Sequence, residues 1–482
     1  MISGQQAIIA SLLDPGRYPH AAKSVRRIET HISWVLLAGR YAYKIKKAVH
    51  PDFLDFTTLE ARLHFCMEEL RLNKRLAPDL YLEVMPIGGT PENPILGALP
   101  AIEYAVRMRR FAARNRLDRL AAKGKLEAAH IDALARKIAK FHLEIPSAPA
   151  GERYGLDMPK TMHLAFHELR ERLGEEVSEL EQEIAQEYSK IEPLVKERVE
   201  AGYVRECHGD LHLGNIALIG GDPVPFDCLE FDPKLRWTDP VNEIAFPFMD
   251  LVHSGKEELA WRFLNAYLEI TGDYAGLPLL RYFASCRATV RGMVDAIRAS
   301  QSGADFEPCR KHLALASRLL RREMPRLFIT HGLPGSGKTT WAVQAAARER
   351  AIRIRSDVER KRLHDIAPEA RTRSGIDSGI YSESSTREVY AFLLHKAANL
   401  LDAGFSVIVD ASFPQRKQRD EFRGLAEARG LSFSIASMHA DYETLKRRIC
   451  ERRNDASEAD LSVLERMMQR FEPVSKLENP ST

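Results

Sequence analysis

The segment "HGDLHLGN" combines two side chains that suit the chemistry of phosphoryl groups. Asp210 and Asn215 are five residues apart in it, on what we expect to be a tight loop. Phosphoryl transfer to an alcohol needs a carboxylate that orients the hydroxyl and accepts its proton, and oxygen ligands that hold Mg²⁺ on the triphosphate. Asp210 suits the first role, and Asn215 suits the second as a neutral oxygen ligand. Asp227, in "VPFDCLEFD", follows a short apolar strand and is a further candidate Mg²⁺ ligand.

A second motif, "GLPGSGKT", fits the pattern G-x-x-x-x-G-K-[ST] of a phosphate-binding loop. It leaves the apolar run "RLFITH" and enters a predicted helix, so backbone N–H groups and the helix N-terminus would surround the phosphates. In this pattern the lysine reaches the β- and γ-phosphates and the Ser/Thr hydroxyl binds Mg²⁺. The residues predicted to contact the nucleotide are Gly332, Gly335, Ser336, Gly337, Lys338, Thr339 and Thr340.

Two carboxylates follow apolar strands downstream of this loop. Asp357 ends "AIRIRSD", and Asp410 ends "FSVIVD", where a Walker B carboxylate binding Mg²⁺ would stand. Further on, "LKRRICERRNDASEAD" is dense in arginine, and arginines on such a segment can stabilise charge in the transition state. The candidates are Arg448, Arg452 and Arg453, with Arg452 the chosen nucleotide contact; a solvated helix face also explains the run. Arg416 and Arg419 are left open between a nucleotide or substrate contact and a structural role.

The elements that must position these residues fall into three regions. Residues 28–49 hold two β-rich runs separated by "AGR", a hairpin signal, and a helix to about Leu76 and further strands follow. This predicts a sheet-rich lobe over residues 1–112. Residues 113–322 are predicted to be mostly helical and to carry the "HGDLHLGN" loop. Residues 323–482 alternate strand and helix, which predicts a parallel sheet covered on both faces.

The first motif resembles that of the aminoglycoside phosphotransferases and related kinases, which carry H-G-D-x-x-x-x-N followed by an aspartate that ends a hairpin strand. The resemblance covers residues 1 to about 320 and implies an α+β, protein-kinase-like, two-lobed domain with ATP bound between the lobes. It assigns Asp210 as the catalytic residue and Asn215 and Asp227 as metal ligands. An α/β P-loop domain would follow it in the chain.

The same resemblance extends to the N-terminal lobe. "AYKIKK" is similar to the strand whose lysine holds the α- and β-phosphates, and this implies Lys44 in preference to Lys46. The implied glutamate partner of that lysine is Glu69, with Glu68 next. "AVRMRRF" would link the lobes and place Met108 near the adenine. Two departures stand out: no glycine-rich loop is found, and Cys228 replaces the glycine that usually follows the metal aspartate.

The second motif resembles the small P-loop kinases, which include gluconate and shikimate kinases, polynucleotide 5′-kinases and zeta toxins. In several of these an aspartate after the second strand activates the acceptor hydroxyl, and the resemblance carries this role to Asp357. The chain as a whole is similar to bacterial fusions of an aminoglycoside phosphotransferase-like kinase with an AAA-type P-loop ATP-binding protein.

Composition narrows the setting of this chemistry. The 482 residues contain 70 Lys and Arg against 67 Asp and Glu, and a net charge of +3 disfavours a nucleic-acid partner and a basic membrane anchor. No apolar run approaches the ~20 residues that cross a bilayer. The N-terminus is a poor signal peptide, and six scattered cysteines indicate free thiols rather than a zinc site, so a cytoplasmic location is predicted. The oligomeric state is left open.

The sequence therefore predicts an ATP- and Mg²⁺-dependent phosphotransferase with two nucleotide sites that phosphorylates hydroxyl groups of small metabolites, with sugar-like acceptors favoured. Two alternatives stand beside it. In one, the P-loop half is the kinase and the kinase-like half is a regulatory nucleotide sensor. In the other, the P-loop half phosphorylates a nucleotide sugar or a nucleic-acid end, and its affinity for RNA would then fall steeply with salt.

Overall fold

The structure is a computed structural model that describes residues 2–50, 55–149, 151–152, 154–366, 382–451, 457, 460–475 and 478. The chain forms two compact units. The first, which we call the kinase-like unit, comprises Met1–Ser254 and Arg281–Ser317. The second, the P-loop unit, comprises Gly255–Leu280 and Arg318–Thr482. Each unit is therefore built from two separate stretches of sequence.

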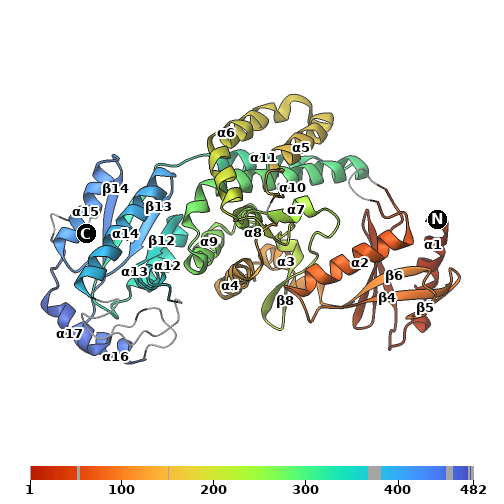
Figure 1. Ribbon diagram of the computed structural model, residues 1–482, viewed down its shortest axis with the longest axis horizontal. Helices are drawn as coiled ribbons and strands as arrows, with labels where there is room; N and C mark the ends of the chain where they lie inside the picture. Colours follow the sequence, from red (N-terminus) through yellow and green to blue (C-terminus); the bar gives the residue numbers. More distant parts are fainter. Residues whose placement is uncertain are drawn as a thin grey trace. The chain divides into compact units, whose positions relative to one another are not determined.

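The N-terminal lobe of the kinase-like unit is a six-stranded antiparallel sheet with strand order β1-β2-β3-β6-β4-β5. Neighbouring residues of a strand point to opposite faces of the sheet, and each face is covered by a helix. Ala105 packs in a cluster with Ile8 and Ile9 of α1. Val106 packs in another with Cys66 of α2 (Figure 1). The elements are α1 (Ile2–Ser11), β1 (Val25–Glu29), β2 (Ser33–Ala38), β3 (Tyr41–Lys46), α2 (Leu59–Lys74), β4 (Tyr81–Thr90), β5 (Asn93–Leu96) and β6 (Glu103–Arg109).

The second lobe of this unit is mainly helical, as its amphipathic sequence predicts. Two short β-ladders, β7–β10 and β8–β9, flank the "HGDLHLGN" loop. The elements are α3 (Leu117–Ala122), α4 (Ala128–Glu144), α5 (Met158–Leu173), α6 (Ser178–Glu200), β7 (Arg205–Glu206), β8 (Ile216–Ile219), β9 (Asp222–Pro225), α7 (Pro233–Arg236), β10 (Trp237–Thr238), α8 (Pro240–His253), α10 (Leu280–Ser302) and α11 (Glu307–Leu320). This order of a strand-rich lobe and a helical lobe confirms the predicted kinase-like fold.

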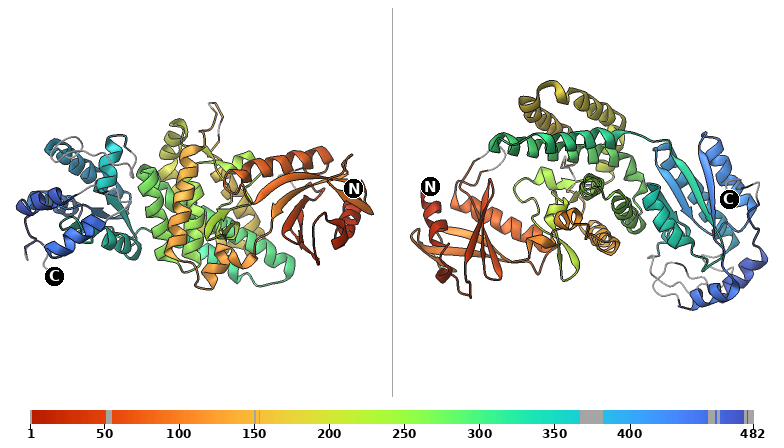
Figure 2. Two further views of the ribbon diagram at one scale, coloured as in Figure 1. Left: turned by 90° about the horizontal axis from the view of Figure 1, so that it is seen from below. Right: turned by 180° about the vertical axis from the view of Figure 1, so that it is seen from behind.

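The P-loop unit is built on a four-stranded, all-parallel sheet with strand order β12-β13-β11-β14. Phe328 and Ile408 are paired across β11 and β13, and both pack against α12. Helices α14 and α15 also pack against strands of this sheet (Figures 1 and 2). The elements are α9 (Glu257–Thr271), β11 (Arg326–His331), α12 (Lys338–Arg348), β12 (Ala351–Arg355), α13 (Ser356–Leu363), α14 (Glu383–Asp402), β13 (Ser406–Asp410), α15 (Arg416–Glu427), β14 (Ser432–Ser437), α16 (Tyr442–Glu451) and α17 (Leu461–Gln469). The predicted α/β P-loop fold is confirmed.

Helix α9 belongs to the P-loop unit although its sequence lies between α8 and α10 of the kinase-like unit. It packs against α12 and β12. Its Asn265 donates from Nδ2 to the Ala351 carbonyl (2.9 Å) and accepts the Arg353 N–H (2.7 Å), so it pairs two backbone groups on the outer edge of β12. The division of the chain therefore differs from the regions 113–322 and 323–482 expected from sequence, because residues 255–280 complete the second unit.

None of the helices in the described part of the chain is long and apolar enough to span a bilayer.

Replacing Asn265 with alanine should destabilise the P-loop unit. The change leaves two buried backbone groups of β12 without their partners, and each such group costs roughly 1–3 kcal/mol. We expect a loss of about 2–4 kcal/mol in the free energy of unfolding, measured by chemical denaturation of the full chain. Asn399→Ala, on the exposed side of α14, is the control and should change stability little. Equal stability of the two variants would contradict the role assigned to α9.

Candidate active sites

The "HGDLHLGN" loop brings Asp210 and Asn215 into direct contact. Asn215 donates from Nδ2 to both the carboxylate and the backbone carbonyl of Asp210, each at 3.0 Å. The Asp210 side chain is 38% exposed and lies 3.5 Å from Nε2 of His212. His212 accepts the Gly214 N–H at Nδ1, so its Nε2 carries the proton that faces Asp210. The loop thus presents an accessible carboxylate whose orientation is fixed on two sides.

His208 holds the loop and is itself held in one tautomer. Its Nε2 donates to the Phe226 carbonyl (3.0 Å), and its Nδ1 accepts the Asp210 N–H (3.3 Å). Burial lowers the pKa of His208 to about 4, with Asp210 opposing the shift, so the ring is neutral at pH 7. His208 and His212 therefore act as loop-holding hydrogen-bonding groups.

The carboxylate of Glu243, on α8, anchors the loop from beneath. It is fully buried and accepts the backbone N–H groups of His208 (2.6 Å) and Gly209 (3.0 Å). Gly209 has φ +85°, and a Cβ there would lie 3.1–3.3 Å from Leu229 and Arg236, so the turn that exposes Asp210 requires glycine. Burial raises the pKa of Glu243, while the two N–H donors and Arg287 oppose the shift.

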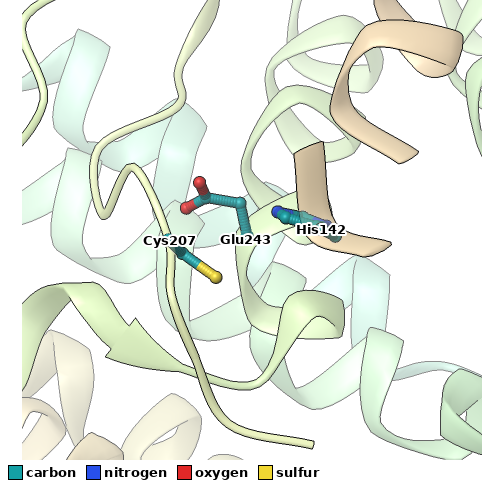
Figure 3. A group of neighbouring side chains, drawn as sticks. All are labelled: His142, Cys207 and Glu243. Atoms are coloured by element: carbon teal, nitrogen blue, oxygen red, sulfur yellow. The ribbon is translucent and has the colours of Figure 1, made fainter. Parts of the chain in front are cut away.

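Glu243 also lies in a buried group with His142 and Cys207 (Figure 3). The carboxylate is directed toward the chain at Cys207, and His142 comes from α4. Cation binding is not supported, because Glu243 is committed to the loop and the Cys207 thiol contacts the Thr238 carbonyl at 3.7 Å. Burial lowers the pKa of His142 to about 3, and nearby arginines add to the effect. The group is best understood as the packed support of the loop.

Lys44 connects the N-terminal lobe to Asp227. Its Nζ lies 2.7 Å from Asp227 Oδ1 and 2.9 Å from Glu69 Oε1. Burial disfavours the charged ammonium, but Asp227 and Glu69 outweigh it and raise the pKa of Lys44 well above its usual value. Asp227 has φ +64°, a strained conformation for a residue with a Cβ, and the Tyr81 hydroxyl accepts its N–H. The implied partners Lys44, Glu69 and Asp227 are thus in contact.

The neighbouring lysine and glutamate have other partners. Lys46 is fully buried and contacts Glu69 and Glu230. Glu68 pairs with Arg71 and Arg236 instead of a lysine of β3. Lys44 is therefore the lysine that contacts Asp227, while Lys46 neutralises the buried carboxylates of Glu69 and Glu230. Glu230 gave no signal in the sequence beyond lying three residues after Asp227.

Met108 lies near the end of β6 and joins an apolar surface shared by both lobes. It packs in the same cluster as Phe111, Ile219, Val224 and Phe226. The rings of Phe111 and Phe226 are 4.9 Å apart. Phe226 directly precedes Asp227, and its N–H donates to the Asn215 carbonyl (2.8 Å). An apolar surface suited to a planar base therefore adjoins the polar residues of the site.

The turn between β1 and β2 contains no glycine. It consists of Thr30, His31 and Ile32, and the Thr30 side chain is hydrogen-bonded to Ser33. The hairpin signal "AGR" forms the turn between β2 and β3. The first hairpin is thus short and internally tied.

The P-loop forms a cradle between β11 and α12. A Cβ at Gly332 (φ +146°) would lie 2.6 Å from the Met438 carbonyl oxygen and 2.7 Å from Ser336 Oγ, so the close turn requires glycine. Lys338 donates from Nζ to the carbonyls of Gly332 and Leu333, each at 2.9 Å. The Ser336 hydroxyl is buried and has no hydrogen-bond partner in the described structure. The Ser336 hydroxyl is therefore a donor available to a polyanion.

A cavity of about 1600 Å³ opens from this cradle. Small-molecule sites are typically ~300–1,000 Å³, so there is room for a nucleotide and a second ligand. Asp357, at the start of α13, and Asp410, at the end of β13, both line it. The predicted residues that also line it are Gly335, Ser336, Gly337, Lys338, Thr339 and Thr340.

Asp410 is buried and paired. Arg353 of β12 lies 3.2 Å from its carboxylate and also contacts Glu269 of α9. Sequence analysis missed this coupling, because Glu269 lies outside the region assigned to the P-loop half. Arg353 lies four residues before Asp357 in the sequence, and this position did not indicate that its partner is Asp410.

The arginines considered as nucleotide contacts separate into different roles. Arg448 donates to the Gly335 carbonyl (3.1 Å) and lines the cavity. Arg419 is fully buried and pairs with Glu478, so its role is structural. Arg416 is exposed and pairs with Asp420. Arg452 and Arg453 lie outside the described residues.

Comparison with known proteins finds similarity to each part of the chain. The family model of the AAA domain matches residues 327–474. Among solved structures, a choline/ethanolamine kinase family protein from Mesorhizobium loti is 12% identical, with a TM-score of 0.41 over 67% of this chain and 95% of its own. Kti12 of Chaetomium thermophilum, solved with ADP-AlF3, is 21% identical, with a TM-score of 0.25 over 32% of this chain and 86% of its own.

Fold and motifs together define a fusion of a kinase-like unit with a P-loop ATPase-type domain. Two curated relatives extend along most of the chain: uncharacterized protein Rv2004c of Mycobacterium tuberculosis and uncharacterized protein Mb2027c of Mycobacterium bovis. Each is 33% identical over 410 residues, which covers 83% of this chain and 80% of the relative. The chain belongs to the same family as these mycobacterial proteins.

Acid should destabilise the kinase-like unit through its buried neutral histidines. The unfolded chain binds a proton near pH 6.5, whereas folded His208 does so only near pH 4, so stability is lost as the pH falls between these values. The loss should be on the order of 2–3 kcal/mol at pH 4. Denaturant unfolding at pH 7, 5.5 and 4.5 measures it, and His208→Gln should flatten the dependence. An unchanged pH slope in that variant would contradict the assignment.

Proposed function

We propose that the protein is an ATP- and Mg²⁺-dependent phosphotransferase with two nucleotide sites that phosphorylates hydroxyl groups of small metabolites, including sugar-like acceptors. The observation that carries the proposal is a continuous set of contacts in the kinase-like unit. Lys44 contacts Asp227, the preceding Phe226 binds the Asn215 backbone, and Asn215 binds Asp210. A phosphate-holding cation, two oxygen ligands and a base therefore share one site.

In the kinase-like site the protein's own groups bind, orient and accept a proton. Lys44 neutralises phosphate charge, and Glu69 holds that ammonium in place. Asp210 accepts the hydroxyl proton of the acceptor, and the Asn215 amide and His212 fix the direction of its carboxylate. Mg·ATP, when bound, supplies the phosphoryl group: the bond from acceptor oxygen to phosphorus forms, the bond to the bridging oxygen breaks, and ADP leaves.

The residues present fit Mg²⁺ at this site. Asn215 uses Nδ2 for both of its side-chain hydrogen bonds, and its Oδ1 makes none with the described residues. Asp227 binds Lys44 through Oδ1, and its side chain is 46% exposed. An amide oxygen and a carboxylate oxygen are the ligand types that Mg²⁺ favours. Asn215 and Asp227 would hold the ion.

In the P-loop site the chain offers a separate set of groups for the same reaction class. Lys338 and the backbone N–H groups of the loop bind phosphates, and Thr339 and Asp410 would hold Mg²⁺. Asp357 lines the cavity at the start of α13, where it can accept the proton of an acceptor hydroxyl. The cavity volume supports a nucleotide and an acceptor bound together.

A nucleotide-sensing role of the kinase-like unit is the second candidate. It is favoured by the short, glycine-free turn between β1 and β2, because glycine is the residue that lets a backbone approach phosphates closely. In that case the P-loop unit alone would transfer phosphoryl groups.

Asp210→Asn and Lys338→Ala separate these functions. Each variant and the wild type are incubated with Mg·ATP and a pool of cell metabolites, and products are detected by mass spectrometry as compounds that gain one phosphoryl group. We expect each substitution to abolish a different product, and Asp210→Asn to slow its reaction by ~10²–10⁴ because a general base is lost.

Exposed residues supply the controls for this experiment. Asp222→Asn on β9 and Lys446→Ala on α16 should leave both products unchanged. If only Lys338→Ala removes a product, the kinase-like unit is a sensor. If neither variant loses a product that the wild type makes, the two-site proposal is wrong.

A further inference from the structure

We propose that the acceptor of the kinase-like site carries an anionic group, such as a carboxylate or a phosphate ester, and that Arg287 binds this group beside Asp210. The inference rests on the function proposed above for this site and names the chemical class of its acceptor.

Arg287 is a buried arginine whose guanidinium is fixed by a hydrogen bond from Nε. It lies on α10 and is 9% exposed. Its Nε donates to Asn242 Oδ1 (3.0 Å), and Asn242 donates from Nδ2 to Thr238 Oγ1 (2.8 Å), so the amide is fixed in the orientation that receives Arg287. Across the ranges that the structure describes, the two Nη atoms of Arg287 make no hydrogen bond or ion pair. The edge of the guanidinium best suited to an oxyanion therefore remains available.

The nearby carboxylates attract Arg287 without directly pairing with it. Burial lowers the pKa of Arg287, and the charges of Glu243 and Asp210 oppose this shift. Glu243 already accepts two backbone N–H groups of the loop, and Asp210 is bound by Asn215. A buried cation without a direct partner is costly, and a ligand oxyanion would satisfy it with two parallel hydrogen bonds.

The surroundings of Asp210 favour an anion over a cation. His212 directs its Nε2 proton at Asp210, and the His212 ring packs on Phe246 with centroids 5.6 Å apart. The Arg287 guanidinium lies 5.0 Å from the centroid of the same Phe246 ring. Asp250, on the same helix as Phe246, accepts the Leu213 N–H through Oδ2 (2.9 Å). His212 and Arg287 thus place N–H donors on either side of the Phe246 ring, and such donors suit an anionic group.

Arg291 extends this donor surface. It follows Arg287 by four residues and so lies on the same face of α10. Its Nε is buried and has no hydrogen-bond partner in the described parts of the chain. A second arginine within one turn suits an acceptor with two anionic oxygens or a longer anionic chain.

Acceptor selectivity tests the proposal directly. The full chain carrying Lys338→Ala, which silences the P-loop site, is given Mg·ATP and matched hydroxyl compounds: D-glycerate, gluconate and glycerol 3-phosphate as anions, glycerol and glucose as neutral compounds, and choline as a cation. We expect phosphorylation of the anionic compounds only. In this background Arg287→Met should raise KM for the anion by about tenfold or more with a smaller change in kcat, and Arg287→Lys should recover part of the loss.

Arg298→Met is the matched control, because it removes an arginine from the exposed end of the same helix, where the side chain is 62% exposed. It should leave KM unchanged. Asp210-dependent phosphorylation of neutral or cationic compounds, with the same KM in wild type and Arg287→Met, would overturn the inference and leave the proposed function standing.

Binding without turnover supplies an independent measurement. Melting temperatures are recorded with the non-hydrolysable ATP analogue AMP-PNP and Mg²⁺, with and without D-glycerate or glycerol 3-phosphate. A ligand of the folded state should raise the melting temperature of the Lys338→Ala chain, and Arg287→Met should abolish this rise. If no compound is phosphorylated but the rise depends on Arg287, the proposed catalysis fails and the anion site stands. No rise with either compound, or the same rise in Arg287→Met, would overturn the anion site.

Discussion

The hydrogen bonds from two loop N–H groups to the buried Glu243 carboxylate are the interaction on which the kinase-like site depends. A carboxylate is expensive to bury, and its cost is offset here because His208 and Gly209 donate to it and Arg287 lies within its field. With the backbone fixed at these two residues, the next residue, Asp210, has one direction in which to point. The orientation of the Asp210 carboxylate thus depends on Glu243 of α8, well away from it in sequence.

The helix that follows α8 in the sequence belongs to the second unit. Helix α9 begins at Glu257, shortly after α8 ends, and it packs within the P-loop unit. There Asn265 pairs the edge of β12, and Glu269 binds Arg353, which contacts Asp410. Stretches adjacent in sequence therefore support Asp210 in one unit and Asp410 in the other. The fusion is consequently more than two domains joined by a linker, since the P-loop unit includes residues 255–280, which a cut near residue 322 would assign to the kinase-like unit.

In the kinase-like unit, buried charged side chains beneath the site are paired with side chains of opposite charge. Lys44, Lys46, Glu69 and Glu230 are buried together, and each has an opposite charge within ion-pair distance. Breaking one such pair leaves an uncompensated buried charge, which is the costly event. Arg287 departs from this pairing, because its neighbours influence it electrostatically without meeting its Nη atoms. A ligand anion would complete the pattern that the rest of the unit already follows.

The sequence by itself determined the features that are local in the chain. The spacing of "HGDLHLGN", the P-loop, and the apolar runs before Asp357 and Asp410 all come from contiguous residues. The alternation of strand and helix predicted the α/β P-loop fold, while the resemblance of the first motif implied the kinase-like fold. Only the tertiary structure decided what depends on distant partners: that Lys46 pairs with Glu230, that Glu243 holds the loop, and that α9 completes the P-loop unit. Burial, pairing and the position of a charge are properties of the folded environment, and residue spacing does not encode them.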